Sequence, residues 1–429
     1  MKYLKKILEN GMTIILAPTK MNAIISIGFF VRVGSRDETD ENNGIAHFLE
    51  HMMFKGTTNR SANDVLHQLD VLGTIYNAVT TMEYTYYYTY GNSNDIKKIL
   101  DIMLDIYINP DFKTNEIKKE KKVIIEEMRM RNDMPIAKLY TIMHKKIFKG
   151  TALERSIIGT EEIINSLSRK DFISFRKKYY RPDNTIFVIV GNFNPIPILK
   201  IVENILKPLK NPVNNISYDN DKKIIMENME NQKQPYVYIK KNILYKQTYV
   251  ILVFPIYDLY KNKRYQIDLL AHLLTSGSTS RLNQSLRENN GITYSSYSYP
   301  MIYSDSGVFV IQLIMNPIEF KKGIKILMNE LKRIKNELMT QDEMHRIQNF
   351  IKTETMSAVS NNSNLLIYYG LNFLQNNNFK PNINEEYDKY KNISRSQVRN
   401  IAREIFLYDK INLLIYGNID IVDFNFLKL

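Results

Sequence analysis

The alternation of strand-like and helix-like segments is the feature that most constrains how this chain can fold. Each half of its 429 residues reads as strand, helix, helix, strand and then more helix. A stretch rich in Asn, Asp, Lys and Glu, bordered by prolines, separates the halves and is typical of a linker. We therefore expect an α+β fold with one unit at 1–210 and a second at 235–429, joined by a linker at 211–234.

The two units are expected to be similar in architecture. Each would be a mostly antiparallel β-sheet covered by helices on one side. A weak internal similarity also suggests a repeat, because His51 and His272 are each followed by a glycine five residues later and an arginine nine residues later.

Composition excludes several classes of protein. The chain has no cysteine, which rules out disulfide frameworks, thiol catalysis and Cys-based metal sites. No uninterrupted apolar run reaches about 18 residues and the N-terminal segment lacks an apolar signal-peptide core, so we expect no membrane span and an intracellular location of unknown compartment. The net charge is +13, but the basic residues are scattered. Nucleic-acid binding is therefore only a rival interpretation, which salt-dependent DNA binding would test.

Residue patterns place the elements of the first half. β-branched and aromatic runs predict strands, or a hairpin in the last case, at 12–17, 23–33, 185–191 and 76–90. Apolar residues at helical spacing predict helices at 44–54, 61–72, 95–108 and 114–131. Ser61 is the expected N-cap of the second helix.

The segment His47-Phe-Leu-Glu50-His51 carries the strongest chemical signal. On a helix, His47 and His51 are four residues apart, so both imidazoles project from one face and can bind one metal ion. Glu50 would lie beside the same ion, where a carboxylate can take a proton from water and pass it to a leaving amine. The alternative is a surface helix with ordinary histidines.

A catalytic zinc needs a third protein ligand, and the helix at 114–131 is the best source. Glu127 lies on the same stripe of that helix as Ile124 and Met128, whereas Glu126 falls toward the solvated side. A carboxylate in an apolar stripe must be paired or metal-bound. Glu127 is therefore the candidate third ligand, and Glu120, two turns earlier, could support the site from behind. Taken alone, both glutamates also fit a solvated helix.

These motifs together resemble a known family. His-x-x-Glu-His is the inverted zinc motif of the inverzincins, and the surrounding segments 34–39 and 44–57 look like the pitrilysin family, in particular its short-chain, processing-peptidase branch. That family has its third zinc ligand 76 residues after the second histidine, where this chain has Glu127, and a further glutamate seven residues earlier, where it has Glu120. The resemblance covers nearly the whole chain.

The resemblance implies roles for these residues. His47, His51 and Glu127 would bind one Zn²⁺ per chain, Glu50 would be the general base, and Glu120 would support the ligands. Manganese or cobalt could replace zinc at such a site. The family also binds its peptide as an added strand, and segment 72–85 resembles that sheet edge.

In the second half, segment 278–295 matches another family pattern. There an arginine and a tyrosine seven residues apart hold the substrate and stabilise the oxyanion, which fits Arg287 and Tyr294. If the repeat is real, Asp268 and Ala271 occupy the positions of His47 and Glu50, so this half would bind no zinc.

The expected function is that of a zinc-dependent metalloendopeptidase acting on unfolded or extended peptides. The resemblance implies two units facing each other around a chamber, and a homodimer or a heterodimer with a related subunit. The alternative is a catalytically silent peptide-binding subunit of a processing peptidase. The charge of +13 gives no support to cationic targeting peptides as substrates.

Overall fold

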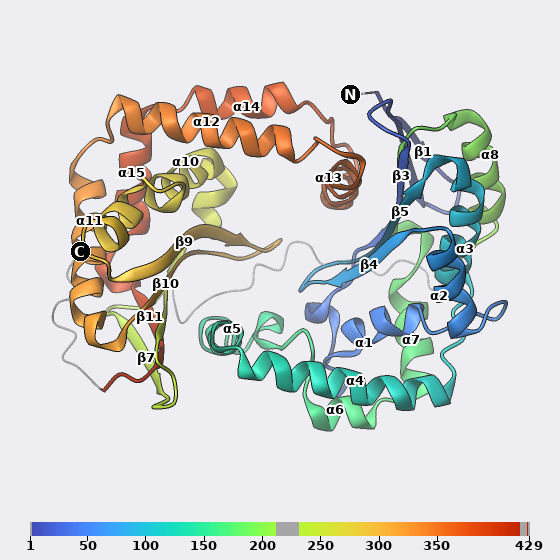
Figure 1. The fold of residues 1–429 in the computed structure, drawn as a ribbon, viewed down its shortest axis with the longest axis horizontal. Coiled ribbons are helices and arrows are strands. Elements are labelled where there is room, and N and C mark those ends of the chain that lie inside the picture. The colour runs from blue at the N-terminus through green and yellow to red at the C-terminus, as the bar shows by residue number, and fades with distance from the viewer. Residues whose placement is uncertain (1, 212–230, 421–426, 428–429) are drawn as a thin grey trace. The chain divides into compact units, whose positions relative to one another are not determined.

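The computed structural model describes residues 2–211, 231–420 and 427 (Figure 1). They form two compact units, each built from separate stretches of the chain. Unit 1 comprises Met1–Arg131, Ala152–Ser217 and Met356–Asn382, and unit 2 comprises Asn132–Thr151, Tyr218–Thr355 and Ile383–Leu429. Most of the predicted linker at 211–234 lies outside the described residues.

Unit 1 is built around a six-stranded mixed sheet. Its strands, in spatial order, are β1 (Leu4–Ile7), β2 (Thr13–Pro18), β6 (Thr185–Gly191), β3 (Ile24–Val31), β5 (Thr85–Asn92) and β4 (Ile75–Thr80). All neighbours are antiparallel except β2 and β6. The predicted α+β fold with a mostly antiparallel sheet is therefore confirmed, and β4 lies at the sheet edge.

Most helices of unit 1 pack on one face of this sheet. They are α1 (Ile45–Met53), α2 (Ala62–Val71), α3 (Ile96–Ile108), α4 (Thr114–Asp133), α6 (Glu161–Ser166), α7 (Arg169–Tyr179) and α8 (Pro195–Leu206). Short 3-10 turns lie at Ser35–Asp37, Ser93–Asp95, Ala152–Glu154 and Pro182–Asn184. Ser61 caps α2 as predicted, since its side chain accepts a hydrogen bond from the backbone N–H of Asp64.

The opposite face of the same sheet is also covered, which corrects the expectation of helices on one side. Helix α13 (Asn362–Gln375), from the late segment of the chain, packs there on β3 and β6. Its buried Leu366 and Tyr369 join Phe30 and Val188 in a second core. Strands β3 and β6 are buried almost throughout because both of their faces are covered.

Unit 2 has a five-stranded mixed sheet. Its strands, in spatial order, are β7 (Tyr236–Lys241), β11 (Asn412–Gly417), β8 (Thr248–Pro255), β10 (Gly307–Met315) and β9 (Thr293–Ile302). The pair β7–β11 is parallel and the others are antiparallel.

Helices also cover both faces of this second sheet. The larger core contains residues of α10 (Tyr257–Thr275), α11 (Phe320–Asn336), α12 (Gln341–Ser357), α14 (Ile383–Lys391) and α15 (Arg395–Ile405). Further short elements are a π-helical turn at Asn283–Glu288 and 3-10 turns at Pro317–Glu319 and Tyr408–Lys410. Helix α5 (Pro135–Ile147), which comes from the first half of the sequence, contacts β8 and β11.

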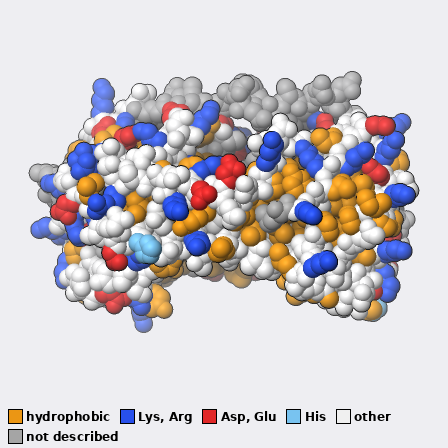
Figure 2. Space-filling view, turned by 90° about the horizontal axis from the view of Figure 1, so that it is seen from above, with side chains coloured by type: hydrophobic (Ala, Val, Ile, Leu, Met, Phe, Trp, Pro, Cys, Tyr) orange, Lys and Arg blue, Asp and Glu red, His pale blue; other side chains and the backbone are white. Residues whose placement is uncertain are grey.

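The surface agrees with the scattered charge seen in the sequence. On the face drawn in Figure 2, Lys and Arg side chains are dispersed among hydrophobic and uncharged ones instead of forming one patch. Within residues 2–211 and 231–420, no helix is both long and apolar enough to cross a membrane.

Candidate metal centre

Helix α1 presents both histidines of the motif on one face. Their rings lie 4.7 Å apart between centroids, as expected for residues one helical turn apart. The opposite face of the helix is held in the core, where Phe48 packs edge-on against Phe172 of α7 at 4.7 Å. The side chains of His47 and His51 are therefore carried by a helix that its neighbours fix in place.

A buried carboxylate caps the beginning of α1. Gly44 precedes the helix with a φ of 98°, a conformation that favours glycine, and it has no side chain to cap the free N–H groups. Glu38 performs that task, since its carboxylate accepts hydrogen bonds from the backbone N–H groups of Gly44 and Ala46 at 2.8 and 2.7 Å. Burial raises the pKa of Glu38 to about 8, and these N–H donors oppose the shift.

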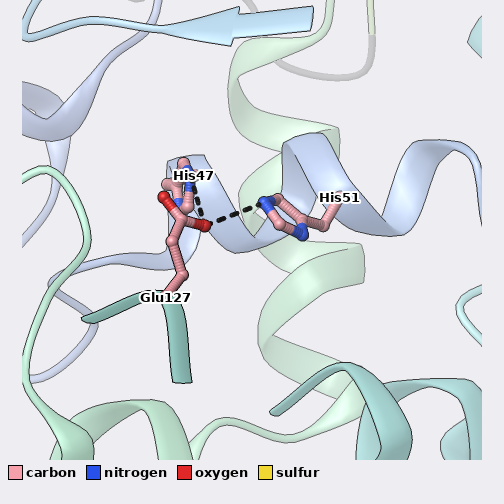
Figure 3. Close-up of side chains that lie close together, drawn as sticks. All are labelled: His47, His51 and Glu127. Carbon is pink, nitrogen blue, oxygen red and sulfur yellow. Dashed lines mark ion pairs between the residues drawn. The ribbon is translucent and has the colours of Figure 1, made fainter. Parts of the chain in front are cut away.

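Glu127 of α4 completes a group of three possible metal ligands (Figure 3). Its Oε2 lies 3.8 Å from Nε2 of His47 and 3.6 Å from Nε2 of His51, and one ligand atom of each residue lies within 4.8 Å of the others. Tetrahedral zinc with bonds of about 2.0–2.1 Å separates its ligands by roughly 3.3 Å. Two imidazoles and one carboxylate at these distances fit a zinc ion, and they leave a fourth position open.

The glutamates of α4 differ in their surroundings. The Glu126 side chain is 69% exposed and pairs with Arg129, so it faces solvent. Glu127 is half-buried and faces the histidines. Glu120 is buried, and its Oε1 accepts a hydrogen bond from Nδ1 of His51 at 2.9 Å. Because a carboxylate accepts this bond, Nδ1 carries the hydrogen and Nε2 of His51 is free for a metal.

The pKa values of the two histidines are shifted in opposite directions. Burial, with the nearby positive charges of His51 and Arg131, lowers the pKa of His47 to about 3, so its imidazole is neutral and has a lone pair to offer. Its Nδ1 is buried without a hydrogen-bond partner among the described residues. Burial also acts to lower the pKa of His51, but the hydrogen bond to Glu120 and the surrounding carboxylates outweigh it and the net shift is upward.

Glu50, the candidate general base, follows His47 by three residues on α1 and contacts strand β4. Burial raises its pKa, while a hydrogen bond from Thr80 acts in the opposite direction. The hydroxyl of Thr80, the last residue of edge strand β4, donates to Oε2 of Glu50 at 2.5 Å. Edge strand and candidate base are therefore in direct contact.

Three residues that support the site were not found from the sequence: Glu38, which caps α1, Lys55, which pairs with Glu120, and Thr80, which bonds to Glu50. Lys55 pairs with Glu120 at 2.7 Å. The sequence held only indirect signals for them, namely an uncapped glycine before the motif helix and a lysine four residues after His51. Each acts through a contact with a residue distant in sequence, or from outside the helix, which periodicity does not reveal.

Arg287 and Tyr294 lie together in unit 2. The guanidinium group of Arg287 stands 5.9 Å from the centroid of the Tyr294 ring, and the Tyr294 side chain is strongly exposed. Arg287 also approaches Glu288 at 3.6 Å. Both side chains are accessible to a ligand, and their role toward a substrate stays a prediction.

Helix α10 of unit 2 carries His272 and Asp268, the residues that the suggested repeat would align with His51 and His47. Nδ1 of His272 shares a hydrogen bond with the Ser276 hydroxyl at 2.8 Å, and its Nε2 lies 3.4 Å from a carboxylate oxygen of Glu354. Asp268 accepts a hydrogen bond from the Tyr390 hydroxyl at 2.7 Å. Across residues 2–211 and 231–420, His47, His51 and Glu127 are the one group of three side chains close enough to hold a metal.

Comparison with known proteins identifies the family. Residues 13–161 match the family model described as insulinase (peptidase family M16), and residues 166–351 match the model described as peptidase M16 inactive domain. An uncharacterized zinc protease of Bacillus subtilis, YmxG, is 33% identical over 304 residues, which cover 71% of each chain. An uncharacterized zinc protease of Rickettsia felis is 33% identical over 311 residues, again 71% of each chain.

Solved structures show the same fold. A protease from Helicobacter pylori superposes with a TM-score of 0.86 at 23% identity, over 97% of this chain and 99% of that one. A peptidase M16 inactive domain from Pseudomonas fluorescens gives a TM-score of 0.84 at 14% identity, over 97% and 98%. The predicted family is thereby confirmed: the chain belongs to peptidase family M16, the insulinase or pitrilysin family.

Proposed function

We propose that this protein is a zinc-dependent metalloendopeptidase that hydrolyses peptide bonds in unfolded or extended peptides. One observation carries the proposal: two imidazoles and a carboxylate from two helices converge within 4.8 Å, and a further carboxylate, Glu50, adjoins one of them in sequence. The printed names of the relatives as zinc proteases support the same assignment.

In this proposal each residue has a defined task. His47, His51 and Glu127 hold the ion, which when bound lowers the pKa of water and polarises the scissile carbonyl. Glu50 removes a proton from the attacking water and delivers it to the amine that leaves. The hydroxyl of Thr80 orients the Glu50 carboxylate for both transfers.

The position of β4 at the sheet edge supports the proposed substrate class. An extended peptide can add to its free edge through main-chain hydrogen bonds, which require an unfolded segment but little specific sequence. Because Thr80 of β4 contacts Glu50, a peptide on this edge would have its backbone near the base. The proposal also assigns substrate contacts to Arg287 and Tyr294 and includes a chamber between two domains, at 1–210 and 235–429, in a homo- or heterodimer.

The experiment compares wild type with Glu50→Gln on a quenched, unstructured peptide, with and without chelator. We expect one zinc per chain in both proteins, chelator-sensitive cleavage by wild type, and loss of cleavage in the variant. Bound zinc without cleavage by wild type would favour the silent peptide-binding subunit. Cleavage that survives in Glu50→Gln would contradict the assignment of the base.

A further inference from the structure

Lys55 lies on the turn that ends α1. The backbone N–H groups of Phe54 and Lys55 bond back to the carbonyls of His51 and Met52, and Gly56 then adopts a φ of 108°. A side chain at Gly56 would meet the backbone N of Ala62 at 3.1 Å, so both its φ and its surroundings favour glycine. From this turn the Lys55 ammonium reaches Glu120 on α4.

The carboxylate of Glu120 is held at both oxygens. Its Oε1 accepts from Nδ1 of His51 at 2.9 Å, and its Oε2 lies 2.7 Å from Nζ of Lys55. The residue is only 4% exposed, so water cannot replace either partner freely. His51 and Lys55 are four residues apart in sequence, and together they enclose one buried carboxylate.

This arrangement joins the two helices that supply the metal ligands. His47 and His51 come from α1, while Glu127 lies on α4 two turns beyond Glu120. The spacing between α1 and α4 therefore sets the distances from Glu127 to both imidazoles. A contact from Lys55 to Glu120 fixes that spacing, and it also fixes the carboxylate that orients the His51 ring.

The environment distinguishes this ion pair from ordinary surface pairs. On the same helix, Lys119 pairs with Glu116 at 2.8 Å, but the Lys119 side chain is 69% exposed. Such a pair contributes little to stability or geometry. In the Lys55 pair, by contrast, the carboxylate is buried and already bonded to a ligand histidine.

We propose that Lys55 is a positioning residue of the metal centre: it holds Glu120 so that His51 presents Nε2 to the ion at the correct distance from Glu127. The inference rests on the proposed metal site and adds to it a residue that touches neither metal nor substrate. Partners of this kind typically alter metal affinity by about 10–100-fold when removed.

The test measures zinc affinity by competition with a chromogenic chelator, using the full-length protein. We expect Lys55→Met to weaken binding by about tenfold or more, and Lys55→Arg to restore affinity to within a few-fold of wild type. Lys119→Met, which removes an ion pair of similar length one residue from Glu120, is the matched control and should bind zinc as wild type does. A purely structural role would lower the melting temperature of metal-free Lys55→Met without changing zinc affinity.

A double-mutant comparison tests whether Lys55 acts through Glu120. In a Glu120→Gln background no buried charge requires a cation, so adding Lys55→Met should cause no further loss of affinity. Equal affinities of wild type and Lys55→Met, or an undiminished effect of Lys55→Met in the Glu120→Gln background, would overturn the inference. Failure of wild type to bind zinc would instead refute the proposed metal site itself, so the two failures are distinguishable.

Discussion

Gly370→Ala tests how α13 packs on the second face of the unit 1 sheet. A Cβ at Gly370 would lie 2.3 Å from Cε2 and Cζ of Phe30, far inside the roughly 3.5 Å contact distance of two carbon atoms. The ring cannot move away easily, because Phe30 is fully buried and stacks on Tyr86 with centroids 5.2 Å apart. The substitution should therefore overpack this core.

Two effects of opposite sign decide the outcome. Replacing a helical glycine with alanine favours the helix by about 1 kcal/mol, whereas overpacking costs about 1–3 kcal/mol and sometimes more. With an overlap of this size we expect a cost at the upper end of that range, so the free energy of unfolding should fall by about 2 kcal/mol in total. For a unit of this size the loss corresponds to a fall in melting temperature of roughly 4–8 °C.

The assay is thermal unfolding of the metal-free protein, followed by circular dichroism. Gly323→Ala in α11 is a control with milder crowding, because its Cβ would meet the flexible Met315 thioether at 2.9 Å and Cγ2 of Ile292 at 3.1 Å. Its melting temperature should change less than that of Gly370→Ala. Adding Phe30→Leu should reduce the cost of Gly370→Ala. A melting temperature of Gly370→Ala at or above that of wild type would refute this packing.

Two further predictions concern catalysis and pH dependence. Thr80→Val removes the hydroxyl that bonds to Glu50, so kcat should fall about tenfold with KM little changed; wild-type kcat in a steady-state assay would contradict this. Burial raises the pKa of Asp268 to about 6 despite the hydrogen bond from Tyr390 and the charge of Arg264. The protonated Asp268 side chain therefore stabilises the fold fully below about pH 4, and this contribution is lost as the pH rises through 6. In Asp268→Asn the free energy of unfolding, measured by urea unfolding from about pH 4 to 7, should fall less steeply with pH. An unchanged pH profile would contradict the assignment.

Much of the candidate site could be predicted from the sequence because it depends on local geometry. The motif of His47 and His51 needs only the helical repeat to place both rings together, and Glu127 stands out because it lies on an apolar stripe. Spacing within a helix translates directly into direction in space. The contacts of Thr80 and Lys55 could not be predicted in this way, since each depends on how two distant segments pack.

For the fold, too, local features could be predicted from the sequence, whereas contacts between distant segments could not. The strands and helices predicted for unit 1 lie within a few residues of the observed ones, but β1, α6, α7 and α8 were not predicted, and neither was α13 on the second face of the sheet. Its place is decided by tertiary contacts between residues more than 300 positions apart in the chain, such as those that join Phe30 and Leu366 in one core. A signal was available: strand β6, Thr185–Gly191, has almost no polar residue, which is typical of a strand covered on both faces.

The most direct test of the metal centre is the zinc content of three proteins purified under zinc-replete conditions: wild type, Glu127→Gln and Glu126→Gln. The two glutamates are neighbours on α4, but only Glu127 faces the histidines, while Glu126 is exposed. We predict one zinc per chain in wild type and in Glu126→Gln, and much less than one in Glu127→Gln. Equal zinc in Glu127→Gln and wild type, or no zinc in wild type, would contradict the account.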